Sequence, residues 1–503
     1  MYPKARWSTW ISGVQAGTPS ARGLKGLQTT YPVSSGVSSG RIFIWRGDSN
    51  VARRTFERPL QRGPGPRRYP GTSAAAGTGK GTYMAMAPAR RPSPSQCPGP
   101  GSLPGVLVIV PSWGQRCGVA EYTRFLIDGL RAQGFTAEIA RGYDHEVSSI
   151  LRRGGFRVVH VQFEYQLFKA SHLQRLVRQL KARGMRVVAT VHDFLPGQVA
   201  ANSLIRDEFS DIIVHSARLR DELSKLGIGP ERIHVIPMGC PRVALSDESA
   251  VRASLGVGPG PALGYFGFAL PQKGIIELAV AAKALRDTVF PHLKVYAFAA
   301  PAFFGSGYPG ELAAFLAGAG LAEGFVLRTE YLPVHEVVNS LHAMDINVLP
   351  YKEMAYVGTS SAVRVLMAAE KPIITTDIPY FDDLDGEVYK IPSADPACIA
   401  EAVLYLMANA AKREEMVYRI RRYLETHNWE QIARRHARLY VRLAAMTTGG
   451  GPSGPGACAS AGEAMVGAEG STHDTWNGDG VPHVAAVPNE VWERVVRRFG
   501  RRG

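Results

Sequence analysis

The stretch RVVHVQFEYQLFKASHLQRLVRQLKARGMRVVATVHDF, residues 157–194, decides the fold class of this chain. It begins with an uninterrupted apolar run, RVVHVQF, and ends with another, RVVATVHDF. The segment ASHLQRLVRQLKARG between them has apolar residues at helical spacing and ends at Gly184, a typical C-terminal cap. Strands that are apolar throughout are typical of a parallel sheet that helices cover on both faces. The stretch therefore predicts a strand–helix–strand unit of a doubly wound α/β domain.

The same alternation continues in both directions and forms two sets of predicted strands, separated by a Gly- and Pro-rich loop at residues 256–261. We expect two Rossmann-like doubly wound domains, at residues 105–243 and 261–428, facing each other across a cleft. A helix at residues 429–446 is expected to bridge back to the first domain. The other predicted strands are 106–110, 211–216, 233–239, 262–268, 293–299, 324–332, 346–351 and 371–377.

Composition limits the class of protein. The 503 residues are 45% hydrophobic and 20% charged, which excludes a wholly disordered chain. No uncharged apolar run approaches the ~18 residues that cross a bilayer, so we expect a soluble protein. The five cysteines are odd in number, far apart and without metal-ligand spacing, which favours a reducing, cytoplasmic location.

The net charge of +15 comes almost entirely from the N-terminal segment. Residues 1–104 hold fifteen Lys and Arg against two acids and are rich in Gly and Pro, so we expect a disordered basic tail. This segment resembles a transit peptide or a lipid- or RNA-binding arm; alternatively, Met84 or Met86 is the true start. Because the middle of the chain is nearly neutral, no nucleic-acid partner is expected. Residues 447–503 are expected to form a flexible tail.

Lys273 is the first candidate for anion binding. It follows a predicted strand in GFALPQKG and stands directly before Gly274 and a helix start. An ammonium beside a helix N-terminus suits a diphosphate. An isolated lysine in a turn is more commonly a surface residue, so the motif alone leaves both interpretations open.

The segment GTSSAVR at residues 358–364 is the second candidate. Its first four residues form a small, hydroxyl-rich helix start whose free amides and hydroxyls can wrap phosphate oxygens. Arg364 lies one turn inside the helix and can reach the same anion. A plain cap with a solvated arginine is the alternative, but the combination with Lys273 favours anion binding. The residues of the helix start are Gly358, Thr359, Ser360 and Ser361.

Three further residues stand where doubly wound sheets place ligands, after the ends of strands. Gly118 lies in a turn before a helix, where the backbone is open to a ligand. His192 ends the strand RVVATVHDF and can bond a sugar hydroxyl or accept a proton. Glu164 follows RVVHVQF in a similar position. An ordinary turn, a satisfied structural histidine and a solvated carboxylate are the respective alternatives.

Several motifs are absent or misplaced. Asp383 and Asp385 form a D-x-D pair, but the pair lies in a loop crowded with acids, and we interpret it as solvated. GTGKGT at residues 77–82 lacks the spacing, the Ser/Thr and the preceding strand of a phosphate loop. No G-x-S-x-G or H-E-x-x-H occurs, so hydrolase triads and zinc chemistry are not expected. No metal site or cofactor is predicted.

In order along residues 106 to about 445, the chain resembles a retaining glycosyltransferase of the GT-B fold, family 4, the glycogen synthase and mannosyltransferase-like group. The resemblance rests on segments spread over both predicted domains and on a last helix that begins at Trp429 and carries Tyr440. These segments are GQRCGVAEYTRFLIDGL, RVVHVQFEYQLF, VVATVHDF, RIHVIPMG, GYFGFALPQKG, INVLPY and GTSSAVRVLMAAEKPIITTD.

The resemblance implies that a nucleotide-diphospho-sugar binds mainly to the second domain and a glycan or lipid-linked acceptor mainly to the first. Gly118 then borders the donor phosphates, His192 contacts the transferred sugar, and Lys273 holds the diphosphate with the amides near Ser360 and Ser361. Such enzymes retain the anomeric configuration without a metal ion, because cations and helix N-termini neutralise the leaving diphosphate. Since some relatives act on lipid-linked acceptors, peripheral membrane contact stays open.

Two departures from the family pattern stand out. The family usually has two glutamates separated by seven residues at the last ligand-binding helix, and alignment on AAEKP puts Val357 and Val365 there. The family's arginine before the lysine corresponds to Phe268. We expect Arg364 to supply the missing positive charge.

The leading hypothesis is therefore a sugar transferase. A second hypothesis is a binding module, a GT-B-like scaffold that has lost its glutamates and only holds a nucleotide sugar. A third, a sugar-nucleotide epimerase, needs carboxylates to move a proton at carbon, and few acids can be placed in the predicted cleft.

Overall fold

Two six-stranded parallel sheets form the framework of the computed structural model, which describes residues 103–302 and 307–446. All of these residues belong to one compact unit. Residues 1–102, 303–306 and 447–503 lie outside the described residues, so the expected tails are not described. Within the described ranges, no helix is long and apolar enough to cross a membrane.

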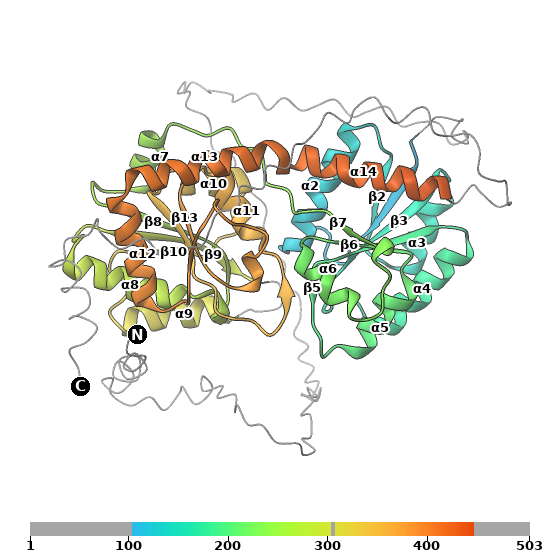
Figure 1. Cartoon of the computed structure of the whole chain (residues 1–503), viewed down its shortest axis with the longest axis horizontal. Coiled ribbons are helices and arrows are strands. Elements are labelled where there is room, and N and C mark those ends of the chain that lie inside the picture. The colour runs from blue at the N-terminus through green and yellow to red at the C-terminus, as the bar shows by residue number, and fades with distance from the viewer. Residues whose placement is uncertain (1–102, 303–306, 447–503) are drawn as a thin grey trace, which may run out of the picture. The chain divides into compact units, whose positions relative to one another are not determined.

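The first lobe is a doubly wound α/β domain with strand order β2-β1-β3-β4-β6-β7, all parallel. Helices cover both faces of its sheet (Figure 1). All five residues of β1 are buried, as its unbroken apolar run predicts. The elements are β1 (Gly105–Ile109), α2 (Gly118–Ala132), β2 (Ala137–Ala140), α3 (Asp144–Leu151), β3 (Phe156–Phe163), α4 (Ala170–Ala182), β4 (Arg186–Val191), β5 (Asp193–Phe194), α5 (Val199–Glu208), β6 (Asp211–Val214), α6 (Ala217–Ser224) and β7 (Ile233–Val235).

The second lobe has the strand order β10-β9-β8-β11-β13-β14, again all parallel, which is the usual order of a dinucleotide-binding fold. The predicted fold class of two Rossmann-like domains is thus confirmed. The elements are α7 (Glu248–Leu255), β8 (Ala262–Ala269), α8 (Ile275–Thr288), β9 (Lys294–Pro301), α9 (Tyr308–Gly318), β10 (Phe325–Arg328), α10 (Val334–His342), β11 (Ile346–Leu349), β12 (Val357–Gly358), α11 (Ser361–Ala368), β13 (Ile373–Thr376), β14 (Tyr389–Ile391), α12 (Pro396–Ala408) and α13 (Ala410–His427).

The last described helix, α14 (Trp429–Met446), packs on the first lobe although it follows the second lobe in sequence (Figure 1). Its apolar face shares a core with the buried residues of α2 and β1. Gly129 of α2 permits the close approach, because a Cβ at this position would lie only 2.6 Å from the Cβ of Ala433. The helix thereby ties the end of the chain to the first sheet.

The two lobes also touch through a short antiparallel ladder and an ion pair. β12 of the second lobe pairs with β5 of the first, in the register Val357↔Phe194 and Gly358↔Asp193. Nearby, Nη1 of Arg218 lies 3.0 Å from Oδ2 of Asp382. These contacts hold the start of α11 against the carboxyl end of β4.

Candidate functional site

A cavity of about 330 Å³ lies among the loops that follow β1, β4, β8 and β11, and both lobes line it. In the second sheet, β8 and β11 flank the point where the strand order reverses, the usual ligand position in doubly wound folds. The lining residues considered below are Gly118, Asp193, Lys273, Tyr351, Thr359, Ser360, Ser361, Arg364, Val365, Tyr380 and Trp429.

Lys273 projects into this cavity. Its Nζ lies 3.6 Å from the ring centroid of Tyr351 and 5.2 Å from that of Tyr380, so two aromatic faces stabilise the ammonium. Gly274 permits the turn: it has a φ of +70°, and a Cβ here would collide with the carbonyl oxygen of Pro350. Burial lowers the pKa of Lys273 to about 7, and the charge of Asp193 acts in the opposite direction. An ordinary surface lysine has none of these contacts.

The start of α11 presents buried donors to the same cavity. Ser360 caps the helix, since its hydroxyl accepts a hydrogen bond from the amide of Val363 at 3.4 Å. Within the described residues, Oγ1 of Thr359 and the Nε and Nη1 atoms of Arg364 are buried and have no hydrogen-bond partner. Buried polar groups are nearly always bonded, so these donors indicate a site for an acceptor-rich ligand. The first amides of a helix favour an anion at the same place.

Arg364 departs in part from the sequence-based expectation. Its side chain is 1% exposed, forms an ion pair with Asp383 through Nη2 and lies 5.5 Å from the ring centroid of Tyr423. Burial acts to lower the pKa of Arg364, but the Asp383 carboxylate and Tyr423 raise it overall. Asp383 therefore neutralises the positive charge that was expected of Arg364, and only its Nε and Nη1 atoms are free to donate hydrogen bonds to a ligand. Asp383 is not the solvated acid that was predicted, whereas Asp385 is exposed.

His192 does not line the cavity, contrary to its expected contact with a sugar. It is buried: Nε2 lies 2.9 Å from Oε1 of Gln162, and Nδ1 lies 3.2 Å from Nε2 of His215. Burial and the neighbouring histidines hold its pKa well below the ordinary value, so the ring is neutral. His192 is one of four buried histidines, His160, His192, His215 and His436, that we call the histidine cluster.

Every member of the histidine cluster has both ring nitrogens bonded. His160 contacts Tyr440 at 2.6 Å and Thr190 at 2.7 Å. His436 contacts the hydroxyl of Tyr122 at 3.2 Å and the carbonyl of Ile432 at 2.9 Å. Since α14 supplies His436 and Tyr440, the cluster bonds the last helix to the first sheet. The bonds of His192 match those of a satisfied structural histidine, the alternative interpretation given above.

Glu164 also lies outside the cavity lining, so its expected contact with substrate is not supported by its position. Its Oε2 accepts the amide of Gln166 at 2.8 Å, and burial raises its pKa. Three other carboxylates line the cavity, and one of them, Asp193, is not among the residues that the sequence predicts for the site. The available signal was its place directly after His192, at the end of a buried strand.

Gly118 and Gly358 differ in the room around them. A Cβ at Gly118 would make only an ordinary van der Waals contact, 3.9 Å, with Oγ of Ser361, which shows that the start of α2 lies near the start of α11. A Cβ at Gly358 would collide with Oδ1 of Asp193. Gly118 and Ser361 line the cavity, while Gly358 is not among its lining residues and lies in β12.

Two family models match the chain, one for each lobe. The model described as Glycosyltransferase Family 4 matches residues 108–241, and the model described as Glycosyl transferases group 1 matches residues 260–409. The two lobes are glycosyltransferase domains of the GT-B fold. No curated protein sequence matches the chain.

Solved structures of other GT-B glycosyltransferases superpose on both lobes. A sucrose-phosphate synthase from Thermosynechococcus elongatus has a TM-score of 0.57 and 16% identity, over 68% of this chain and 100% of that one. A glycosyltransferase from Rickettsia africae has a TM-score of 0.56 and 11% identity, over 68% and 98%. HepE from Anabaena in complex with UDP has a TM-score of 0.54 and 15% identity, over 67% and 99%.

The glycosyltransferase domains lack carboxylates at both positions where the family resemblance places glutamates. Val365 lines the cavity with an aliphatic side chain, and Val357 pairs with Phe194 in the interlobe ladder. Phe268, which stands in place of the family's arginine, also lines the cavity. Among the described residues, no group of three or more His, Cys, Asp or Glu is arranged to hold a metal ion.

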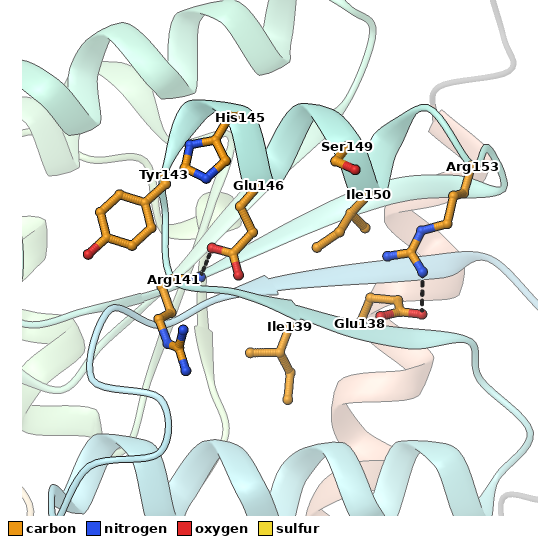
Figure 2. A pocket seen from close by; sticks show the side chains of 9 residues that line it. All are labelled: Glu138, Ile139, Arg141, Tyr143, His145, Glu146, Ser149, Ile150 and Arg153. Atoms are coloured by element: carbon orange, nitrogen blue, oxygen red, sulfur yellow. Dashed lines mark hydrogen bonds and ion pairs between the residues drawn. The ribbon is translucent and has the colours of Figure 1, made fainter. Parts of the chain in front are cut away.

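A second cavity, of about 590 Å³, lies wholly in the first lobe beside β2 and α3 (Figure 2). Its acids are already bonded: Glu146 accepts the amide of Arg141 at 2.7 Å, and Glu138 lies 3.5 Å from Arg153. Because no residue of the second lobe lines it, we place the candidate site in the first cavity.

Proposed function

We propose that this chain transfers a sugar from a nucleotide-diphospho-sugar to an acceptor hydroxyl and retains the configuration at the anomeric carbon. One observation carries the proposal: Lys273 and the donor-rich start of α11 lie in one cavity between two glycosyltransferase domains. A diphosphate offers the oxygens that these donors need.

In the proposed reaction, the Lys273 ammonium, the Thr359 hydroxyl and the first amides of α11 hold the diphosphate of the donor. The bond between the anomeric carbon and the diphosphate oxygen breaks, and the acceptor oxygen bonds to the same face of that carbon. The acceptor proton passes to the departing phosphate oxygen. Negative charge grows on the diphosphate as it leaves, so fixed donors and an ammonium stabilise the transition state without requiring a metal ion.

The donor is expected to be bound mainly by the second lobe, which supplies Lys273 and α11. UDP in the similar Anabaena structure supports a uridine nucleotide as the first one to test. The acceptor, a glycan or a lipid-linked sugar, is expected to approach from the first lobe, in a cytoplasmic setting with or without peripheral membrane contact.

A nucleotide-sugar binding module is the second candidate function. Val357 and Val365 favour it, because an aliphatic side chain cannot accept a hydrogen bond from a ribose or sugar hydroxyl.

The two functions are separated by incubating the full chain with UDP-glucose, UDP-N-acetylglucosamine, GDP-mannose and ADP-glucose and measuring the free nucleoside diphosphate. A transferase releases diphosphate from at least one donor, at a rate that rises with an added acceptor. Tight binding of a donor without any release contradicts transfer and supports the module. For an active donor, the anomeric proton coupling of the product, measured by NMR, tests retention.

A further inference from the structure

Asp193 is a carboxylate of the first lobe that lines the same cavity as Lys273 and the start of α11. Its Oδ1 accepts a hydrogen bond from the Tyr380 hydroxyl of the second lobe at 3.0 Å. The described residues supply no hydrogen bond to its Oδ2. Burial raises the pKa of Asp193 to about 6, the Tyr380 bond and the Lys273 charge lower it, and the Glu164 charge raises it. At neutral pH the group is therefore mostly an ionised acceptor with one free oxygen.

The fold holds this carboxylate in place through the interlobe ladder. Asp193 is the β5 residue that faces Gly358 of β12, and only a glycine leaves room there for its Oδ1. The ring of Tyr380 also lies close to the position that a Cβ of Gly358 would take. A backbone pairing and a side-chain bond from the second lobe thus fix the same carboxyl group.

The Asp193 carboxyl group lies near a position where the family has a glutamate and this chain has a valine. Val357, where the resemblance expects a glutamate, precedes Gly358 in β12. Among the described residues that line the cavity, the carboxylates are Glu121, Asp193 and Glu330. Of these three, Asp193 alone shares a strand pairing with β12.

Charge decides which part of a donor Asp193 can face. A carboxylate repels a diphosphate, whereas the unpartnered donors of Thr359 and Arg364 attract it. Asp193 is therefore suited to a hydroxyl of the donor, and Thr359 and Arg364 are suited to its phosphate oxygens. A sugar hydroxyl that donates to an ionised carboxylate forms a charge-assisted hydrogen bond.

We propose that Asp193 binds a hydroxyl of the transferred sugar and thereby selects the donor, supplying from the first lobe the carboxylate that Val357 lacks. This inference rests on the proposed function. In the absence of donor, the Lys273 ammonium is attracted to the Asp193 carboxylate. When the donor is bound, the ammonium pairs with the diphosphate, and the carboxylate can accept a hydrogen bond from the sugar. Because Asp193 belongs to the first lobe and Lys273 to the second, this hydrogen bond would form only when both lobes contact the donor.

The test uses Asp193→Asn and Asp193→Ala, with Asp207→Asn, an exposed acid of α5, as the matched control. Binding of UDP and turnover of the donor found active in the panel are measured for each, together with deoxy analogues of that donor. We expect UDP affinity to change less than threefold, and kcat/KM for the intact donor to fall about 10- to 100-fold, as for loss of a hydrogen bond to a charged group.

One deoxy analogue should be turned over equally by wild type and Asp193→Ala, because the hydroxyl that Asp193 binds is already missing. Asp193 does not select the sugar if kcat/KM of wild type and of Asp193→Ala differ as much with every deoxy analogue as with the intact donor. The same conclusion follows if UDP affinity falls as much as kcat/KM does. A wild-type protein that releases no diphosphate from any donor instead overturns the proposed function itself.

Discussion

Two groups of buried polar side chains differ in whether their hydrogen bonds are complete. In the histidine cluster, every ring nitrogen has a partner within 3.2 Å. In the group formed by Lys273, Thr359 and Arg364, which we call the cavity cluster, several buried donors have no partner among the described residues. A completed network stabilises the fold, whereas an incomplete one is arranged for something that is not part of the chain.

The largest effect on stability is expected from removing Arg364, the residue of the cavity cluster that forms an ion pair with Asp383. Arg364→Met leaves the Asp383 carboxylate buried beside α11 without its counter-ion. Losing one partner of a buried ion pair costs about 3–5 kcal/mol, so the free energy of unfolding should fall by roughly that amount. Urea unfolding of the full chain measures it.

The double variant Arg364→Met with Asp383→Asn provides the control. Removing the second charge should restore at least half of the lost stability, because no buried charge is then unpaired. Equal stability of the single and double variants would show that the ion pair does not contribute as the geometry indicates.

His192→Ala tests the histidine cluster. The change leaves Oε1 of Gln162 and Nε2 of His215 without a partner, which should lower the free energy of unfolding by about 1–3 kcal/mol. Affinity for UDP-glucose, measured by calorimetry, should stay within twofold of wild type. The exposed His145→Ala is the matched control and should change neither quantity. A strong loss of UDP-glucose affinity with an unchanged free energy of unfolding would instead support the contact between His192 and the sugar that the family resemblance implies.

The smallest effect concerns pH. Burial holds the pKa of Lys273 at about 7, and the protonated form binds the diphosphate, so affinity should fall as pH rises through 7. Between pH 6 and pH 8 the expected loss is about tenfold, in proportion to the protonated fraction. UDP-glucose is the suitable ligand, because its diphosphate keeps a constant charge in this range. At pH 8, binding should take up a proton, and Lys273→Met should show a flat profile; a flat wild-type profile would contradict the lowered pKa.

The fold could be predicted because each buried parallel strand is a run of consecutive, mostly apolar residues that is visible in the sequence. The runs that became β1, β3, β4 and β8 are mostly apolar, and each is followed by a segment with helical spacing. In the site, Lys273 and the start of α11 could be predicted for the same reason, since both stand directly after a strand or before a helix.

Partners that come from other strands could not be predicted in this way. His192 bonds Gln162 and His215 because the register of the first sheet aligns β3, β4 and β6, which is not visible in one segment. Asp193 enters the cavity because β5 pairs with β12, a contact between segments from different lobes. The partner of Arg364 is Asp383, which lies a whole strand and a turn further along the chain.

The proposed function depends on Lys273, which is proposed to hold a diphosphate in the cavity between the lobes. Calorimetric titration of UDP and uridine into wild type, Lys273→Met and the exposed-lysine control Lys225→Met tests it most directly. We predict that Lys273→Met weakens UDP binding about 30- to 100-fold, as for loss of a hydrogen bond to a charged group, and leaves uridine binding and the control unchanged. Equal UDP affinity in all three proteins would contradict the account.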